Sequence, residues 1–347
     1  MNTNQNFQNS DDELYAEYAA LFDPLITDRK ARRRRVPKPV HKPKATDQQI
    51  LEQIADEVGW ETHFQTTYRP SKHEAEWLLD SLSPFFEQSL ISDVLSIVKG
   101  GKEASVYCCA AHPSMDVKWL AAKVYRPRIF RGLSKDQIYR EGRQILSADG
   151  HIVHENKDRI IRAIGKKTAF GQQVSHSSWL MHEFQALEKL HQAGGKVPQP
   201  FMAGSNAILM SFIGAERIAA PMLNTIRLGK AEAESLFEIV LQNVELMLQH
   251  HLIHADLSAY NILYMQGEIV IIDLPQVVDS NQNRSAPAIL ARDIQRVCEY
   301  FLAQGVRCEP QEIFRDLWQR YMHVPRHILR ADQSRLAQYY PDIFGDG

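Results

Sequence analysis

The apolar positions of the chain follow two periods, which predict a small sheet followed by a mainly helical half. Residues 91–111 (ISDVLSIVKGGKEASVYCCAA) have the pattern of two strands joined by a glycine turn. Residues 119–127 (WLAAKVYRP) are predicted to form a third strand that ends near Pro127, and residues 207–214 (AILMSFIG) a buried strand. We therefore expect an antiparallel β-meander in the first half.

Apolar residues three or four positions apart predict the helices. The predicted helices cover residues 45–58, 75–90, 179–192 and 232–250, and the chain from about residue 286 onward. In the third helix (WLMHEFQALEKLHQ), Leu180, Phe184, Leu187 and Leu190 share one face. This face should pack against a core.

Two segments lie between these long elements. Residues 128–177 are charged and show no clear period, so we expect an insertion with at most short helices. Residues 262–264 and 268–273 are predicted to pair as a short hairpin that turns at Gly267. The whole order, a small sheet with one helix and then a mostly helical half, predicts an α+β protein.

Charge is distributed unevenly along the 347 residues. The formal charge is only −2, but the run from Arg29 to Lys44 (RKARRRRVPKPVHKPK) holds nine of the 40 lysines and arginines and no acid. Because like charges repel and proline blocks helix formation, residues 1–45 are expected to be a mobile tail. The run has no aromatic residues for base stacking, so contact with RNA would use phosphates; a merely solvated run is the alternative.

Composition predicts a soluble protein of a reducing compartment. No run approaches the roughly 18 apolar residues that a membrane span needs, and the first residues lack the apolar core of a signal peptide. Cys108, Cys109, Cys298 and Cys308 form neither a CxxC pair nor a disulfide framework. We therefore expect a cytoplasmic protein with no membrane partner.

The strongest chemical signal is in residues 250–264, HHLIHADLSAYNILY. This run holds His254, Asp256 and Asn261, polar groups that are costly to bury without partners. Asn261 directly precedes the first strand of the predicted hairpin and Asp273 follows the second, so the hairpin brings both to one end. Such oxygen ligands suit Mg²⁺ that also keeps waters and phosphates in its shell.

The spacing matches the H-x-D-x-x-x-x-N motif and later Asp of phosphoryl-transfer enzymes. Asp256 would then accept a proton or orient a hydroxyl. Asn261 and Asp273 would hold Mg²⁺, or Mn²⁺ in its place, and His254 would brace the loop. A helix end with an Asx turn that leads into a hairpin is the structural alternative.

The upstream half offers candidates for nucleotide binding. Gly100 and Gly101 lie at a predicted strand turn, where backbone N–H groups can approach phosphates without a Cβ in the way. Only Gly101 matches the kinase pattern G-x-G-x-x-G-x-V, so an ordinary hairpin is the alternative. Lys123 on the third strand could bind phosphates, and Glu183 could hold it. The ordinary alternatives are an exposed lysine on an edge strand and a glutamate that faces solvent. All these parts occur in the order that a bilobal kinase fold requires.

The sequence resembles the RIO family of atypical protein kinases, in its bacterial-type branch without a winged-helix domain. The similar segments are GKEASVY, AAKVYRP, WLMHEFQALEKL, LMSFIG, HADLSAYNIL, IIDLPQVVD and ARDIQRVCEYF, and they span about residues 81–304. In IIDLPQVVD, Leu-Pro-Gln replaces the Phe-Gly of ordinary kinases. The stretch between Lys123 and Glu183 is longer than expected for the family. No A-P-E motif follows Asp273, which fits the family and argues against generic peptide phosphorylation.

The resemblance implies a serine/threonine kinase or ATPase that uses ATP and Mg²⁺. Lys123, held by Glu183, would bind the α and β phosphates, with Asp256 as catalytic residue and Asn261 and Asp273 on the metal. Further ATP contacts would come from Gly101, Lys102, Glu103 and Ser105 in the loop and from Met210, Ser211 and Ile213 beside the adenine. In this family the metal-binding Asp, here Asp273, is also implicated as acceptor of a transient phosphoryl group.

The resemblance also implies domains and partners. The expected divisions are a tail at residues 1–45, helices at 46–90, the kinase N-lobe and hinge at 91–213 and the C-lobe at 214–347. The family's role in small ribosomal subunit maturation implies RNA or a ribosomal particle as the partner of the tail. The protein acceptor stays unknown.

Other readings use some of the same residues. His250, His251 and His254 could suggest zinc, but their helix face breaks at the loop and no nearby Cys or carboxylate completes four ligands. A small-molecule phosphotransferase of the aminoglycoside or choline kinase type shares the H-x-D-x-x-x-x-N motif, although GKEASVY and LPQ favour the RIO family. A nucleotide-switched assembly factor with little kinase activity would use the same site.

Overall fold

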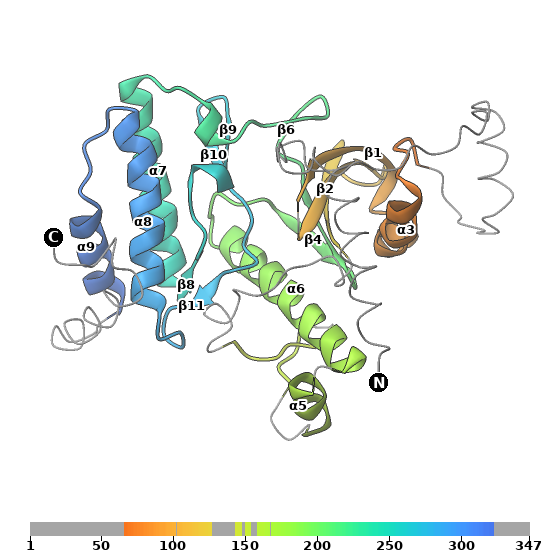
Figure 1. Cartoon of the computed structure of the whole chain (residues 1–347). Coiled ribbons are helices and arrows are strands. Elements are labelled where there is room, and N and C mark those ends of the chain that lie inside the picture. Colours follow the sequence, from red (N-terminus) through yellow and green to blue (C-terminus); the bar gives the residue numbers. More distant parts are fainter. Residues whose placement is uncertain are drawn as a thin grey trace, which may run out of the picture.

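The computed structural model describes six stretches of the chain. They are residues 66–101, 103–126, 143–147, 150–153, 158–166 and 168–322. The predicted basic tail, the predicted helix at 45–58 and Lys102 lie outside these stretches, as do residues after 322. Figure 1 shows the described chain as a sheet-based half and a helical half.

The first half is built on a five-stranded antiparallel sheet with the strand order β1-β2-β3-β5-β4. Its strands are β1 (Ile91–Gly100), β2 (Ala104–Ala111), β3 (Trp119–Tyr125), β4 (Pro200–Ala203) and β5 (Ala207–Ser211). The predicted meander and the predicted strand near residue 207 are confirmed. The register places Lys123 of β3 opposite Val106 on one side and Ile208 on the other, so it lies in the middle of the sheet.

Two helices cover opposite faces of this sheet (Figure 1). Helix α3 (Lys72–Glu87) packs on the face that carries Ala122, and α6 (Ala169–Gln192) packs on the face that carries Tyr125. Side chains alternate between the faces of a strand, so Lys123 points to the same side as Tyr125. This alternation aims Lys123 at α6.

Helix α6 begins ten residues before the predicted start at Trp179. Its N-cap is Thr168, whose hydroxyl accepts a hydrogen bond from the backbone N–H of Gly171 at 3.1 Å. The first part of the helix (AFGQQVSHSS) has no apolar period, which is why the pattern missed it. A Cβ on Gly171 would collide with a carbonyl oxygen of α5 (Asp158–Gly165), so the glycine lets the two helices pack closely. The expected irregularity of residues 128–177 is therefore wrong for this part.

The second half is mainly helical. It contains α7 (Lys230–Gln249), α8 (Ala286–Ala303) and α9 (Pro310–Met322), and the first two lie side by side (Figure 1). The predicted helix at 232–250 and the helical character after residue 286 are confirmed as far as residue 322. The apolar faces of α6, α7 and α8 share one core, so the helix that carries Glu183 is packed directly on the second half.

Short strands and turns connect α7 to α8 and β5 to α7. They are β6 (Gly214–Ala215), β7 (Ile218–Ala219), η3 (Leu223–Thr225), β8 (Leu252–Ile253), η4 (Ala259–Asn261), β9 (Ile262–Met265), β10 (Glu268–Ile271) and β11 (Val278–Asp279). The β9–β10 pair is the predicted hairpin, with Gly267 at its turn in a left-handed conformation (φ 84°). The predicted α+β class and the two-lobed architecture are confirmed.

Candidate active site

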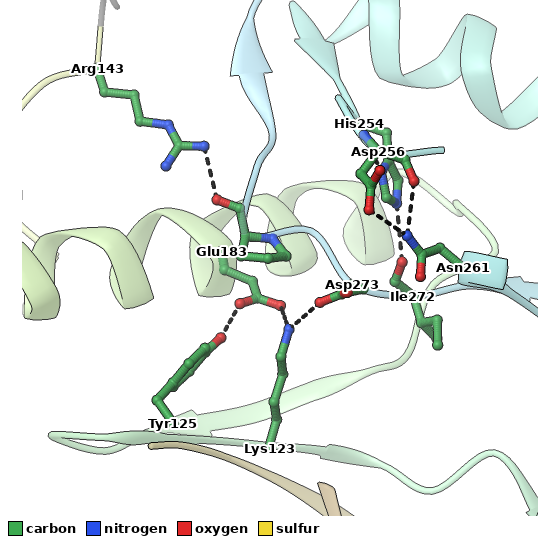
Figure 2. A network of polar contacts seen from close by, with 10 residues as sticks. Lys123, Tyr125, Arg143, Glu183, His254, Asp256, Asn261, Ile272 and Asp273 are labelled. Carbon is green, nitrogen blue, oxygen red and sulfur yellow. Dashed lines mark hydrogen bonds and ion pairs between the residues drawn. The ribbon is translucent and has the colours of Figure 1, made fainter. Parts of the chain in front are cut away.

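Lys123 is held between two carboxylates that come from distant parts of the chain (Figure 2). Its Nζ lies 2.6 Å from Oε1 of Glu183 on α6 and 2.5 Å from Oδ1 of Asp273. Lys123 and Glu183 are buried, whereas the Asp273 side chain is 44% exposed. The ordinary alternatives, an edge lysine and a solvent-facing glutamate, are therefore wrong.

The charges of this cluster depend on one another. Burial alone would lower the pKa of Lys123, but Asp273 and Glu183 outweigh it and raise that pKa well above its usual value. Partial desolvation of the half-exposed Asp273 carboxylate works against its ionised form, yet the Lys123 ammonium holds the pKa of Asp273 below its usual range. Burial raises the pKa of Glu183, and Lys123 opposes that rise. Lys123 therefore stays a cation, the form that binds phosphate.

Tyr125 supports Glu183 and was not predicted. It lies two positions after Lys123 on β3, so both side chains project from the same face of the strand. Its hydroxyl donates a hydrogen bond to Oε2 of Glu183, which gives each oxygen of that carboxylate its own donor (Figure 2). The spacing of two between Lys123 and Tyr125 was the signal in the sequence that could have found it.

The HADLSAYN segment forms the loop after β8, in which Asp256 and Asn261 contact each other. Nδ2 of Asn261 donates to the backbone oxygen of Asp256 at 2.8 Å and to its Oδ2 at 3.0 Å. The two Asp256 oxygens that the Asn261 amide contacts are both acceptors, so Nδ2 of Asn261 must face Asp256. Oδ1 of Asn261 is then left for another partner. This arrangement orients the Asn261 oxygen that the sequence assigned to a metal.

Backbone contacts tie this loop to the chain that carries Asp273. The N–H of Ile272 donates to the carbonyl oxygen of Asn261 at 2.9 Å, and Nε2 of His254 lies 3.0 Å from the carbonyl oxygen of Ile272. Nδ1 of His254 accepts the N–H of Asp256 at 3.3 Å, so Nε2 carries the proton. Burial lowers the pKa of His254, which favours this neutral ring. His254 thus braces the loop, as predicted.

Helix α8 holds the same loop from the other side. Arg292 donates to the carbonyl oxygen of Ala255, and Oδ2 of Asp293 accepts the N–H of Ala255 at 2.7 Å. Ala255 has a φ of 67°, a left-handed conformation that is strained for a residue with a Cβ. Nη1 of Arg296 donates to Oδ1 of Asp256 at 2.8 Å. Sequence reasoning missed these three α8 residues, although their spacing in ARDIQR places them on one helix face.

Part of the 128–177 insertion reaches the segment after Asp273. Nη2 of Arg143 donates to the carbonyl oxygens of Pro275 and Val277 at 2.9 and 2.5 Å. Figure 2 shows Arg143 reaching toward the chain beside Glu183. The next residue, Gln144, contacts α6, because its carbonyl oxygen lies 2.6 Å from Nε2 of His182. The insertion therefore links α6 to the chain that follows the metal-ligand candidate.

The predicted phosphate loop lies between β1 and β2. A Cβ on Gly101 would lie 2.8 Å from the carbonyl oxygen of Ala104, so the turn requires glycine there. The carbonyl oxygen of Glu103 accepts the N–H of Arg126 at 2.9 Å, and Ser105 is buried on β2. The roles of these residues and of Lys102 in binding ATP stay predictions.

The predicted adenine contacts lie at the end of β5. Met210 is buried, and Ser211 is the last residue of the strand, paired with Leu120 of β3. Ile213 follows two residues later, and its carbonyl oxygen accepts the N–H of Ala220 at 2.9 Å. These residues connect the two halves of the molecule, and their contact with adenine stays a prediction.

The oxygen atoms that the site offers to a metal fit Mg²⁺. They are the half-exposed carboxylate of Asp273 and Oδ1 of Asn261. Within the described stretches, no group of three or more His, Cys, Asp or Glu side chains could hold a metal ion. A cation between Asn261 and Asp273 would therefore take its remaining ligands from phosphates and water, as Mg²⁺ does with nucleotides.

Comparison with known proteins shows the family. A model described as "RIO domain" matches residues 147–313. The RIO-type serine/threonine-protein kinase Rio1 of Thermoplasma acidophilum is 31% identical over 135 residues, which cover 39% of this chain and 69% of that protein. Serine/threonine-protein kinase RIO1 of Chaetomium thermophilum is 30% identical over 230 residues, 63% of this chain and 41% of that protein. The chain belongs to the RIO family.

Other similar proteins differ more in length or sequence. The chain spans between 35% and 66% of the length of three further curated RIO1 relatives that it matches. A solved structure, the Rio2 kinase–ADP/Mg²⁺–phosphoaspartate complex from Chaetomium thermophilum, has 18% sequence identity and a TM-score of 0.49. That similarity covers 73% of this chain and 70% of the solved one.

Proposed function

We propose that this protein is an ATP- and Mg²⁺-dependent serine/threonine kinase or ATPase of the RIO type. One observation carries the proposal: the Lys123 ammonium is held 2.6 Å from Glu183 and 2.5 Å from Asp273, beside the loop of Asp256 and Asn261. Membership of the RIO family supports it, because the matched relatives are named serine/threonine-protein kinases.

Each residue of the cluster has a role in this proposal. Lys123, fixed by Glu183, binds the α and β phosphates, and Asn261 and Asp273 hold Mg²⁺. When bound, the cation neutralises charge on the phosphates. Asp256 orients the acceptor oxygen, which attacks the γ-phosphorus while the bond to the ADP oxygen breaks. The acceptor proton leaves to Asp256 or to water. Catalysis then rests on positioning and charge neutralisation.

The acceptor is either a Ser/Thr hydroxyl, a water molecule or the carboxylate of Asp273 itself. Attack by Asp273 would form an acyl phosphate and release ADP, and water would then cleave the acyl phosphate to give free phosphate. The half-exposed carboxylate of Asp273 is accessible enough for this route. The net reaction of that route is ATP hydrolysis.

The test follows the label from γ-³²P-ATP in the full-length protein, with and without ribosomal particles. We expect Asp256→Asn and Asp273→Asn each to lower phosphoryl turnover by at least about 10²-fold. Asp316→Asn is the matched control, because Asp316 is an exposed carboxylate on α9 that pairs with Arg320. Turnover at the wild-type level in both folded site variants would refute the site.

The fate of the label identifies the acceptor. Label that hydroxylamine removes from the protein would indicate an acyl phosphate on Asp273, whereas a phosphoserine or phosphothreonine would resist it. Label only in free phosphate would indicate an ATPase. Label in a small metabolite would instead support a small-molecule phosphotransferase with the same site.

We also propose that the basic run at residues 29–44 docks the protein on RNA or a ribosomal particle in the cytoplasm. Nine cations without an acid support phosphate binding, although the run lies outside the described residues. All four cysteines are free thiols, as a reducing compartment requires. Among the described helices, none has the length and apolar character to span a bilayer. ATP turnover would then act as a release switch for the docked particle.

A further inference from the structure

Asp256 has a hydrogen-bond donor on each of its two carboxylate oxygens. Oδ1 accepts from Nη1 of Arg296 at 2.8 Å, and Oδ2 accepts from Nδ2 of Asn261 at 3.0 Å. Each oxygen of a carboxylate has two lone pairs, so one on each oxygen is left for a substrate. Donors on both oxygens hold the carboxylate plane in one orientation.

Arg296 belongs to a helix face that already holds the backbone below Asp256. Arg292 and Asp293 bond the carbonyl oxygen and the N–H of Ala255, and Arg296 lies about one turn further along α8. The helix is anchored by buried apolar residues in the main core. One rigid element thus sets both the backbone of the loop and the direction of the Asp256 side chain.

The ion pair between Arg296 and Asp256 contributes little to the stability of the fold. Their side chains are 41% and 48% exposed, and exposed ion pairs contribute little to stability. Asp256 is the only hydrogen-bond partner of Arg296 within the described chain. The planar guanidinium donates in a fixed direction, which suits a role in orienting a carboxylate.

We propose that Arg296 is a positioning residue for phosphoryl transfer, which holds the Asp256 carboxylate in the orientation that meets the acceptor oxygen. This inference rests on the proposed function. Arg296 contacts neither Lys123 nor Asp273, so it acts on the acceptor side of the reaction and not on nucleotide binding.

The experiment measures steady-state phosphate release from Mg²⁺-ATP by the full-length protein. We expect Arg296→Gln to lower kcat about 10-fold and to change KM for ATP by less than about twofold. In an Asp256→Asn background, Arg296→Gln should cause no further loss, because the carboxylate that it positions is gone. Arg296→Lys keeps a cation and should recover part of the rate. Arg320→Gln is the control, since Arg320 is similarly exposed and pairs with Glu245 and Asp316.

Two kinetic results would overturn the inference: wild-type kcat in Arg296→Gln, or an equal loss in both backgrounds. If wild-type protein and the Arg320→Gln control both release no phosphate, the proposed function fails instead.

Discussion

Removal of the Lys123 ammonium should make the stability of this protein depend strongly on pH. In a Lys123→Met variant, the Glu183 carboxylate, which is 1% exposed, keeps the hydrogen bond from Tyr125 but loses its cation. A carboxylate buried without a counter-ion takes up a proton instead. Asp273 also loses Lys123, but its exposed carboxylate can be solvated by water.

The free energy needed to protonate Glu183 sets an upper limit on the stability that the Lys123→Met variant loses. Protonation of a carboxyl with an unfolded pKa of about 4.3 costs about 1.4 kcal/mol for each pH unit above that value. For Glu183 the limit is therefore about 4 kcal/mol at pH 7 and about 1 kcal/mol at pH 5. In the folded variant the pKa of Glu183 lies above its unfolded value. The variant therefore keeps its full stability below the unfolded pKa of Glu183. It loses stability as the pH rises from that value toward the folded pKa.

The assay is urea unfolding followed by tryptophan fluorescence between pH 5 and pH 8. Lys123→Met should lose far more unfolding free energy at pH 7 than at pH 5, relative to wild type. The double variant Lys123→Met/Glu183→Gln has no buried glutamate to protonate, so it should recover stability at pH 7 and lose the pH dependence that Lys123→Met adds to that of wild type.

A control variant is Lys196→Met. Lys196 forms an exposed ion pair with Glu268, so its loss should cost less than about 1 kcal/mol at every pH. A loss in Lys123→Met that is the same at pH 5 and pH 8, or a double variant no more stable than the single one, would refute the electrostatic account of the cluster.

Two further predictions concern α8 and the tail. Burial raises the pKa of Asp293 to about 7, so the wild-type protein should lose stability as the pH rises from about 4, the unfolded pKa, to about 7. Asp293→Asn has no proton to release and should show a flatter thermal-melting profile; an unchanged pH profile would contradict this. Deletion of residues 29–44 should lower the log–log salt slope of RNA binding by up to about 6–8 if all nine cations meet phosphates. An unchanged slope would eliminate the run as the docking element.

Local pattern was sufficient for most elements of the fold. Apolar periodicity predicted β3, the main part of α6, α7 and the β9–β10 hairpin, because the spacing of buried positions follows from the geometry of each element. It failed where a helix has no apolar face. The first turns of α6 are polar, and only the Thr168 cap and the close packing of Gly171 on α5 mark them as helix.

Residue types and their order along the chain predicted Lys123, Glu183, Asp256, Asn261 and Asp273 as one site. Their convergence required the folded chain, since Lys123 bonds to carboxylates 60 and 150 positions away. The role of Arg296 has the same origin. Its partner Asp256 lies 40 positions earlier, and no local pattern relates the two.

The sequence by itself determined most of the elements, because the spacing of buried positions within an element is local. It also determined the candidate site residues, because their types and order along the chain match a known motif. Only the tertiary structure decided that Tyr125 supports Glu183, that Arg143 reaches the chain after Asp273, and that α8 holds Ala255 and Asp256. Those contacts depend on how α6 and α8 pack against the sheet and the loop. That packing is set by the shape of the whole core, and no local spacing encodes it.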